Sequence, residues 1–444
     1  MSALDLNCLV SPRQYTKAPP LNVLGDLREQ ASVVWVDEPV LDDWPGGNGF
    51  WLVLRHKEVG QVLKQARLFS SALGGTQMLD PASQQDLHFV QRMMLNMDPP
   101  EHSRFRRLLS ASFTSRAVTA VEERIREHAR GIVDKLVHDF CRNGQGTCDF
   151  AADIAADMPL LTLAEIFGMP AEDRFLMYDW ANRVIGFQDP DYATSAAFDP
   201  ASGSDMASAA SALRPIPDDN GVMPDPRTRE GMPDLYHYAQ LLAEHKRRTP
   251  GNDIMSLLLS AMDGEEGISN AEFENLFWLF CVAGNETLRN GIPGGMLALL
   301  QHPEQLARLQ TEPDLIPGAV DEMLRWWTPV MNFRRTAAQD CELDGQAIKT
   351  GDKVVVSFIS ANRDATVFAD PDTFDIDRAP NPHLAFGYGP HFCLGAQFAR
   401  CQMESIFSEV LSRLTDFEIA GELSFLRSNF QRGIKRFPIR FSIR

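Results

Sequence analysis

One stretch constrains this chain more than any other: residues 386–395, with the sequence FGYGPHFCLG, which place a single cysteine behind two glycines. Gly387 and Gly389 allow backbone angles that other residues rarely adopt, so a shaped loop is expected. From Leu394 onward the sequence predicts a helix. The free N–H groups and the dipole at a helix start lower the pKa of a nearby thiol and favour the thiolate, the form that binds metal ions. A lone cysteine beside a turn is more often a buried structural residue. The glycines, the histidine two residues earlier and the helix start together favour Cys393 as a metal ligand.

The chain is acidic, with 444 residues and a net charge of −18. Nucleic acids and anionic membrane surfaces attract basic proteins, so this charge argues against both as partners. The length suggests roughly three domains, yet no low-complexity linker or repeat divides the sequence. On composition alone, a single large fold across residues 1–444 therefore remains open. No stretch approaches ~20 apolar residues, so neither a membrane-spanning helix nor a membrane anchor is expected.

The seven cysteines are odd in number and include no Cys-x-x-Cys pair. This pattern fits free thiols in a reducing compartment better than a disulfide framework. The first 20 residues contain no apolar run of the kind that a signal peptide requires. A cytoplasmic protein is therefore expected.

Hydrophobic periodicity divides the chain into a small β region, a long helical region and a final mixed region. The predicted fold class is mainly α with small β-sheets, an α+β arrangement. The first two strands are expected to pair as a hairpin because a glycine-rich turn precedes the second. Strands are predicted at 33–36, 50–54, 333–337 and 353–358, and helices at 21–32, 57–65, 117–140, 152–168, 172–187, 235–248 and 270–301, with a last long helix ending near Leu414.

Residues 188–234 differ in character from the rest of the chain. They are rich in Asp, Pro, Ser, Ala and Gly and contain few apolar anchors. A loop beyond ~15 residues within a compact domain is usually functional or disordered. A short helix is predicted at 207–213 inside it.

The longest predicted helix contains the pentapeptide Ala-Gly-Asn-Glu-Thr at residues 283–287. Gly284 costs about 1 kcal/mol of helix stability relative to alanine. The Thr287 hydroxyl can bond to a carbonyl one turn earlier. Together they predict a place where the helix opens and holds water, with Glu286 as a proton donor beside the hydroxyl. The alternative is a tolerated glycine in a core helix.

The pattern Phe-Gly-x-Gly-x-His-x-Cys-x-Gly, complete in the cysteine stretch, resembles the haem-binding signature of the cytochrome P-450 family, the haem-thiolate monooxygenases. The resemblance implies this family's fold over nearly the whole chain. Haem b would lie between the long central helix and the cysteine loop with the last long helix. Cys393 would be the axial ligand of the iron, and Phe386, Gly387, His391 and Gly395 would surround the cofactor.

The same resemblance assigns roles to residues of the long helix. Glu286 and Thr287 match the acid–alcohol pair that delivers protons to bound dioxygen in this family. Ala283 and Gly284 match the groove above the iron. Because peroxide-driven relatives lack such a pair, the resemblance implies dioxygen and a reductant as the normal supply.

Glu322 and Arg325 lie three residues apart, on one face of a predicted helix. As a surface pair they would contribute only a few tenths of a kcal/mol. The resemblance instead assigns them to the family's buried Glu-x-x-Arg pair, with Arg378 as its third member. Their implied role is a structural lock on the loop that presents Cys393, for which a bidentate arginine–carboxylate interaction is suited.

Haem carries two carboxylates, and buried carboxylates need cations. Matched motifs supply four residues for these propionates. His102 and Arg106 lie four apart on one helix face, and Arg335 and His391 come from later segments. Arg334 and Arg335 are interchangeable on the sequence alone.

The sequence has no flavin or ferredoxin module of its own. The resemblance therefore implies electrons from a separate ferredoxin and ferredoxin reductase, with NAD(P)H as their source. A local basic cluster that includes Arg104 and Arg107 would receive an acidic ferredoxin, because electrostatic complementarity governs encounter rates.

An apolar pocket implies an apolar substrate. Several wider phrases resemble the bacterial branch that oxidises steroid side chains and methyl-branched lipids, and terpene hydroxylases are close in type. Residues 188–234 depart from that branch's compact lid and would form a long lid insertion between the two helices that cover the substrate entrance. The pocket positions, each also a plain core residue by type, are Val282, Ala283, Val330, Phe333 and Phe430.

Hydroxylation of an apolar substrate, most simply a steroid, terpenoid or branched lipid, is the leading hypothesis. One alternative is a non-oxygenating haem protein on the same fold, such as a ligand sensor or an isomerase. The Glu286–Thr287 pair argues against it. A second alternative is a zinc site at Cys393 and His391, which lacks a second clustered thiol.

Overall fold

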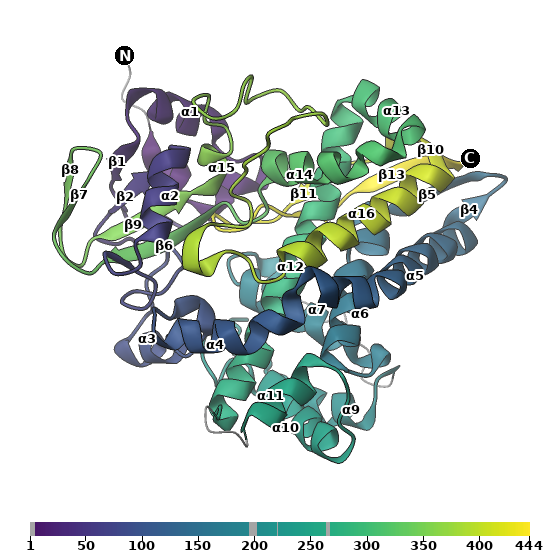
Figure 1. Cartoon of the computed structure of the whole chain (residues 1–444), viewed down its shortest axis with the longest axis horizontal. Helices are drawn as coiled ribbons and strands as arrows, with labels where there is room; N and C mark the ends of the chain where they lie inside the picture. Colours follow the sequence, from purple (N-terminus) through teal and green to yellow (C-terminus); the bar gives the residue numbers. More distant parts are fainter. Residues whose placement is uncertain (1–4, 195–201, 220, 263–266) are drawn as a thin grey trace.

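The computed structural model describes residues 5–194, 202–219, 221–262 and 267–444. Helices predominate, and they are arranged around one long central helix, α12, which packs against α6, α7, α10 and α14 (Figure 1). The helices are α1 (Leu21–Gln30), α2 (His56–Lys64), α3 (Gln84–Val90), α4 (Glu101–Ser110), α5 (Ser115–Phe140), α6 (Asp157–Phe167), α7 (Arg174–Ile185), α8 (Pro190–Ala193), α9 (Asp205–Ser211), α10 (Pro233–Arg248), α11 (Ile254–Met262), α12 (Asn270–Gln301), α13 (Pro303–Thr311), α14 (Ile316–Trp327), α15 (Phe358–Ala361) and α16 (Ala396–Arg413).

The strands are short and form four small sheets. The largest, ordered β1-β2-β9-β6-β3, lies at the upper left of Figure 1. A second sheet, ordered β10-β13-β5-β4, joins the end of the chain to the strands that follow α5. The strands are β1 (Val33–Val36), β2 (Phe50–Val53), β3 (Phe69–Ser70), β4 (Cys141–Arg142), β5 (Gln145–Asp149), β6 (Asn332–Ala337), β7 (Cys341–Leu343), β8 (Gln346–Ile348), β9 (Lys353–Ser357), β10 (Leu414–Ile419), β11 (Ser424–Phe425), β12 (Ile434–Arg436) and β13 (Pro438–Ile443).

The predicted fold class is confirmed, and so are the elements with the strongest patterns. The predicted hairpin is present, with β1 and β2 antiparallel and Val33 opposite Val53. The helix predicted at 270–301 is α12 itself. It begins at a capping box in which the Ser269 hydroxyl accepts from the Glu272 main-chain N–H and the Glu272 carboxylate accepts from the Ser269 main-chain N–H.

The helix predicted at 152–168 is divided in two. A single wide π-helical turn, Phe150–Ala155, comes first, and α6 begins at Asp157. Pro159 lies in the first turn of α6, where a helix needs no donated N–H, so the proline favours a new helix start at this point.

The last long helix also begins later than predicted. It starts at Ala396, with Gly395 as its N-terminal cap, two residues after the predicted start at Leu394. The α12 segment at 283–287 is likewise different from the expectation of an opened helix, because α12 is helical throughout. A Cβ at Gly284 would lie 2.7 Å from a methyl carbon of Leu163 on α6, so this glycine allows the close approach of two helices.

Residues 188–234, where the structure describes them, contain α8 and α9 and are held largely by charged contacts. Arg214 binds the buried carboxylate of Asp179 on α7 at 2.9 Å. Asp189 accepts from Lys435, on β12, at 3.0 Å. These ion pairs explain how a segment with few apolar residues packs on the helices beside it. The predicted helix at 207–213 is α9.

Candidate active site

The cysteine loop is shaped by its two glycines, as the sequence predicts. Gly387 and Gly389 have φ angles of +69° and +71°. A Cβ at Gly389 would lie 2.6 Å from the main-chain oxygen of Leu63, so this position also needs glycine for space. The main-chain N–H of Cys393 donates to the Phe386 carbonyl at 2.9 Å, which closes the loop and fixes the direction of the sulfur.

The electrostatics of Cys393 differ from the expectation. Burial raises the pKa of its thiol above the ordinary value, and the Gly395 main-chain N–H, Arg106 and Arg400 only partly oppose this. The prediction of a lowered pKa was wrong because burial of the thiol outweighs these contributions. Binding of a metal ion displaces the thiol proton, so a thiolate at this position would depend on the metal.

Four basic side chains lie together beside this loop. The rings of His102 and His391 are 3.9 Å apart. Arg106 donates to the Phe392 carbonyl at 2.8 Å, and Arg335, which is 3% exposed, donates to the Arg334 carbonyl at 2.7 Å.

Burial lowers the pKa of all four groups, and neighbouring cations lower the pKa of the two histidines further. Burial and then Arg335 lower the pKa of His391 to about 2, and burial and then Arg106 lower that of His102 to about 4. Burial also lowers the pKa of Arg335 to about 10. At neutral pH the cluster therefore contains two arginine cations and two neutral histidines, and the positive charge of the arginines is left without a matching carboxylate.

This imbalance tests whether the site fits haem. Among the described residues, no carboxylate lies within ion-pair distance of Arg106 or Arg335. Arg334, which the sequence left interchangeable with Arg335, forms an ion pair with Asp80. Two propionates would supply the missing negative charge. The side chains present therefore fit haem, with the sulfur of Cys393 on the same loop as His391.

The acid and alcohol of α12 lie next to each other on the helix but have different environments. The Thr287 hydroxyl donates to the Ala283 carbonyl at 3.0 Å, as predicted. The Glu286 carboxylate is completely buried, and its Oε1 accepts from Arg289 at 2.9 Å and from Asn290 at 3.1 Å. Its Oε2 is buried without a partner in the described part of the chain.

Arg289 is the residue of this group that sequence reasoning missed. It lies three residues after Glu286, and this spacing on a helix is the signal that could have found it. Burial disfavours its charge, but Glu286, Tyr192 and Tyr178 together raise its pKa above the ordinary value. Arg289 also donates to Asn182 on α7 at 2.6 Å, which ties the two helices together at the acid.

Glu322, Arg325 and Arg378 meet in a buried network. Arg325 holds Glu322 through two hydrogen bonds of 2.7 Å, and Arg378 donates to the same carboxylate at 3.2 Å. Arg325 also donates to the Asn362 carbonyl at 2.9 Å. The Asn362 side chain accepts from the Leu384 N–H at 2.7 Å, two residues before the cysteine loop. A continuous series of polar contacts thus runs from the ion pair to the loop.

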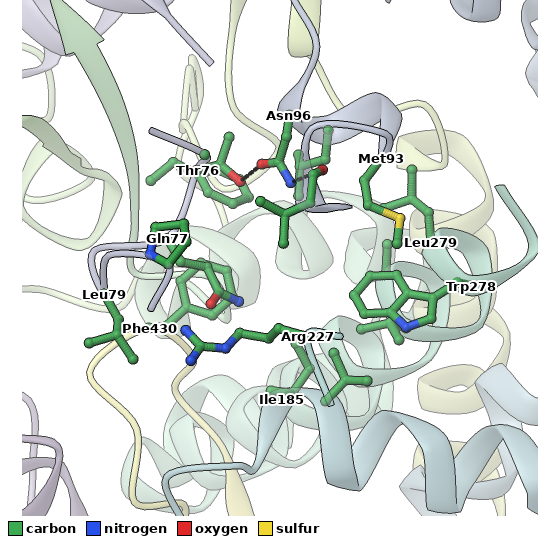
Figure 2. Close-up of a pocket in the computed structure, with 18 of the residues that line it drawn as sticks. Thr76, Gln77, Leu79, Met93, Asn96, Ile185, Arg227, Trp278, Leu279 and Phe430 are labelled. Atoms are coloured by element: carbon green, nitrogen blue, oxygen red, sulfur yellow. Dashed lines mark hydrogen bonds between the residues drawn. The ribbon is translucent and has the colours of Figure 1, made fainter. Parts of the chain in front are cut away.

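A cavity with about 1030 Å³ of empty space lies beside α12 (Figure 2). Thr287 lines it, and most of the other lining side chains are apolar. The five pocket positions chosen from the sequence all line it: Val282, Ala283, Val330, Phe333 and Phe430. Sequence reasoning missed the contributions of Met93, Ile185 and Trp278, and of the charged residues Asp86, Asp225 and Arg227. Trp278 lies on α12 one turn before Val282, so helical spacing could have found it. The other five lie on segments whose spatial arrangement no local pattern reveals.

Two further findings concern the alternatives. In the described ranges, no group of three His, Cys, Asp or Glu side chains could hold a metal ion, so the zinc site lacks a ligand set. The helices of the described chain include none with the length and apolar character needed to cross a membrane.

Comparison with known proteins agrees with this geometry. The family model for cytochrome P450 matches residues 236–422. The chain is 35% identical to a steroid C26-monooxygenase of Mycolicibacterium smegmatis over 95% of its own length and 91% of that protein. It is 32% identical to linalool 8-monooxygenase of Pseudomonas putida, over 97% and 98% of the two chains. A Mycobacterium marinum cytochrome P450, CYP268A2 in complex with pseudoionone, is 34% identical, with a TM-score of 0.82 and 99% of both chains covered. The chain therefore belongs to the cytochrome P450 family, the haem-thiolate monooxygenases.

Proposed function

We propose that this chain hydroxylates an apolar terpenoid, steroid or branched lipid with dioxygen and with electrons from a separate ferredoxin. The observation that carries the proposal is the large apolar cavity that borders Thr287. Relatives named for steroid and linalool oxidation support the apolar substrate class.

When bound through Cys393, haem supplies the iron that activates dioxygen, and the thiolate increases the electron density on it. His102, Arg106, Arg335 and His391 would hold the propionates. Phe386, Gly387 and Gly395 would shape the loop around the sulfur, and Ala283 and Gly284 would border the cofactor on α12. The two arginines, which have no carboxylate partner within the described ranges, support the first assignment.

The chain's own contribution to the chemistry is to control protons and water. Glu286 would pass protons to the Thr287 hydroxyl, which lies at the cavity. Glu286 is sequestered by Arg289 and Asn290, so its carboxylate must turn away from them before it can give a proton to Thr287. The apolar lining would keep bulk water away from the substrate carbon that reacts. Val330, Phe333 and Phe430 would orient the substrate.

Glu322, Arg325 and Arg378 would act as a lock, holding the cysteine loop through Asn362 and Leu384. The support is the set of contacts between them, which leaves both oxygens of Glu322 with partners. The loop would keep its shape while substrates bind in the cavity and leave it.

Residues 188–234 would form a lid in a single domain that spans the chain. The support is that Asp225 and Arg227 of this segment line the cavity.

The electron donor, ferredoxin with its NAD(P)H-dependent reductase, would approach from the side of the cysteine loop, where Tyr388 and Phe392 are exposed. Arg104, which was expected to receive it, is paired with Glu272, so it would contribute little. The seven free cysteines support a reducing compartment, and we place the enzyme in the cytoplasm.

The spectrum of the reduced protein with carbon monoxide tests the proposal. We expect the Soret band of a thiolate-bound haem. It should be lost in Cys393→Ser and retained in the control Cys401→Ser, because Cys401 is a partly buried cysteine on α16, outside the cysteine loop. Substrate-dependent NAD(P)H consumption with hydroxylated product, using a reconstituted ferredoxin system, would then establish oxygenation. A missing thiolate band in the unaltered protein would refute the assignment.

A further inference from the structure

Among the described residues that line the cavity, Arg227 is the only one with a basic side chain. Figure 2 shows it extended along the cavity on the side of Leu79 and Phe430. We propose that Arg227 selects the substrate by donating a hydrogen bond to a neutral oxygen, a hydroxyl or a carbonyl, while the charges around it disfavour a carboxylate. This inference rests on the proposed function, because it names the polar group that the apolar substrate carries.

The donors of Arg227 are only partly used within the protein. Its Nε and Nη2 donate to the two oxygens of Asp225, at 3.0 and 2.8 Å. A guanidinium has five N–H donors, and within the described part of the chain no acceptor is bonded to Nη1. A largely apolar cavity therefore contains a fixed donor group whose Nη1 can serve a further acceptor.

The guanidinium is held in place before any ligand binds. It lies over the ring of Phe187, 4.7 Å from the ring centre. The Asp225 carbonyl accepts from the Thr228 hydroxyl at 2.8 Å, which fixes the turn that presents both charged residues. Arg229, two residues further along, binds Glu274 of α12 at 2.6 Å. Preorganisation of this kind reduces the ordering cost of binding.

The net charge of the lining decides between neutral and anionic ligands. Asp86 and Asp225 both line the cavity, so its lining carries two carboxylates and one guanidinium. Asp225 already neutralises Arg227, and Asp86, which has no ion pair among the described residues, adds a further negative charge. A ligand carboxylate would therefore meet net repulsion, whereas a hydroxyl or carbonyl would accept from Nη1 without bringing charge.

The test compares ligands that share one unbranched carbon skeleton: tetradecane, tetradecanol, methyl dodecyl ketone and myristate. Binding to the haem-loaded protein is measured by calorimetry and by the shift of the Soret band. The alcohol and the ketone are expected to bind roughly tenfold more tightly than the hydrocarbon, as a hydrogen bond to a charged donor implies, and more tightly than myristate. Arg227→Met should remove this advantage and leave tetradecane binding unchanged.

Asp225→Asn is expected to increase the affinity for an anionic ligand. Without its counter-charge Arg227 should attract anions, so myristate is expected to bind on the order of tenfold more tightly than to the unaltered protein. The control is Arg116→Met, an exposed arginine of α5 that does not line the cavity, which should change none of the four affinities. Tighter binding of myristate than of tetradecanol to the unaltered protein, or an equal loss for all four ligands in Arg227→Met, would overturn the inference. Calorimetry gives this order of affinities even if the thiolate spectrum is absent, so the two proposals fail separately.

Discussion

Glu286 and Arg289, one turn apart on α12, form a completely buried ion pair in which only one carboxylate oxygen is used. Oε1 accepts from Arg289 at 2.9 Å, and Oε2 has no partner in the described chain. The acid proposed to supply protons is thus held by a neighbour that also binds Asn182 on α7. The pair serves stability and restrains the acid at the same time.

Replacement of Arg289 by methionine should destabilise the protein strongly. It leaves Glu286 buried without its counter-charge, and removal of one partner of a buried pair costs roughly 3–5 kcal/mol. The free energy of unfolding in urea measures this. The control is Arg124→Met, whose pair with Glu165 is half exposed and should contribute less than about 1 kcal/mol. Equal losses in the two variants would contradict the buried-pair interpretation.

Thr287→Ala should uncouple reductant consumption from product formation. The alanine removes the hydroxyl that donates to the Ala283 carbonyl and borders the cavity, so protons from Glu286 lose their last carrier. Hydrogen peroxide released per NAD(P)H consumed is expected to rise severalfold, and product to fall correspondingly. Thr287→Ser keeps a hydroxyl and should restore most of the coupling. Unchanged coupling in the alanine variant would mean that protons follow another route.

The sequence was sufficient for elements whose residues interact locally. The pattern of α12 predicted both of its ends, and the two glycines of the cysteine loop have the positive φ angles expected of them. It failed where a distant segment decides the outcome. Gly284 was interpreted as a weak point in a helix, yet its lack of a side chain accommodates Leu163 of α6. No local pattern contains that contact.

Charges were predicted less well than positions for the same reason. The pKa of Cys393 is set mainly by burial of its thiol, which no local pattern reveals, and α16 begins two residues later than predicted. Arg334 and Arg335 could not be told apart until the position of Asp80 was known, since only one of the two reaches it. Arg227 lies in a segment without periodicity, where its contribution to the cavity could not be predicted.

The apoprotein should lose stability as the pH falls below the ordinary histidine value of 6.5. Burial first, and Arg335 or Arg106 second, lower the pKa of His391 to about 2 and that of His102 to about 4. In this window the unfolded chain binds protons that the folded protein does not, so the free energy of unfolding decreases with decreasing pH. The slope should reach roughly 1.4 kcal/mol per pH unit for each histidine.

Urea unfolding of the apoprotein between pH 6.5 and about 4 measures this slope. The double variant His102→Gln, His391→Gln removes both titrating groups and should flatten the dependence. A slope that is unchanged in the double variant would assign the pH dependence to other groups. Haem-loaded protein should show less of the effect, since propionates beside the two rings favour their protonation.

Arg325→Lys tests whether the network at Glu322 holds the cysteine loop. Lysine keeps the charge but cannot reproduce the two 2.7 Å hydrogen bonds to Glu322 together with the bond to the Asn362 carbonyl. We expect a loss of roughly 3 kcal/mol or more in the free energy of unfolding and a lower ratio of bound haem to protein. The matched control is Arg126→Lys, because Arg126 pairs with Glu122 on an exposed face of α5 and should change neither quantity. Because Asn362 connects the pair to Leu384 beside the loop, haem retention should fall even at temperatures where the variant remains folded. Normal haem content in a folded Arg325→Lys protein would show that the loop keeps its shape without the network.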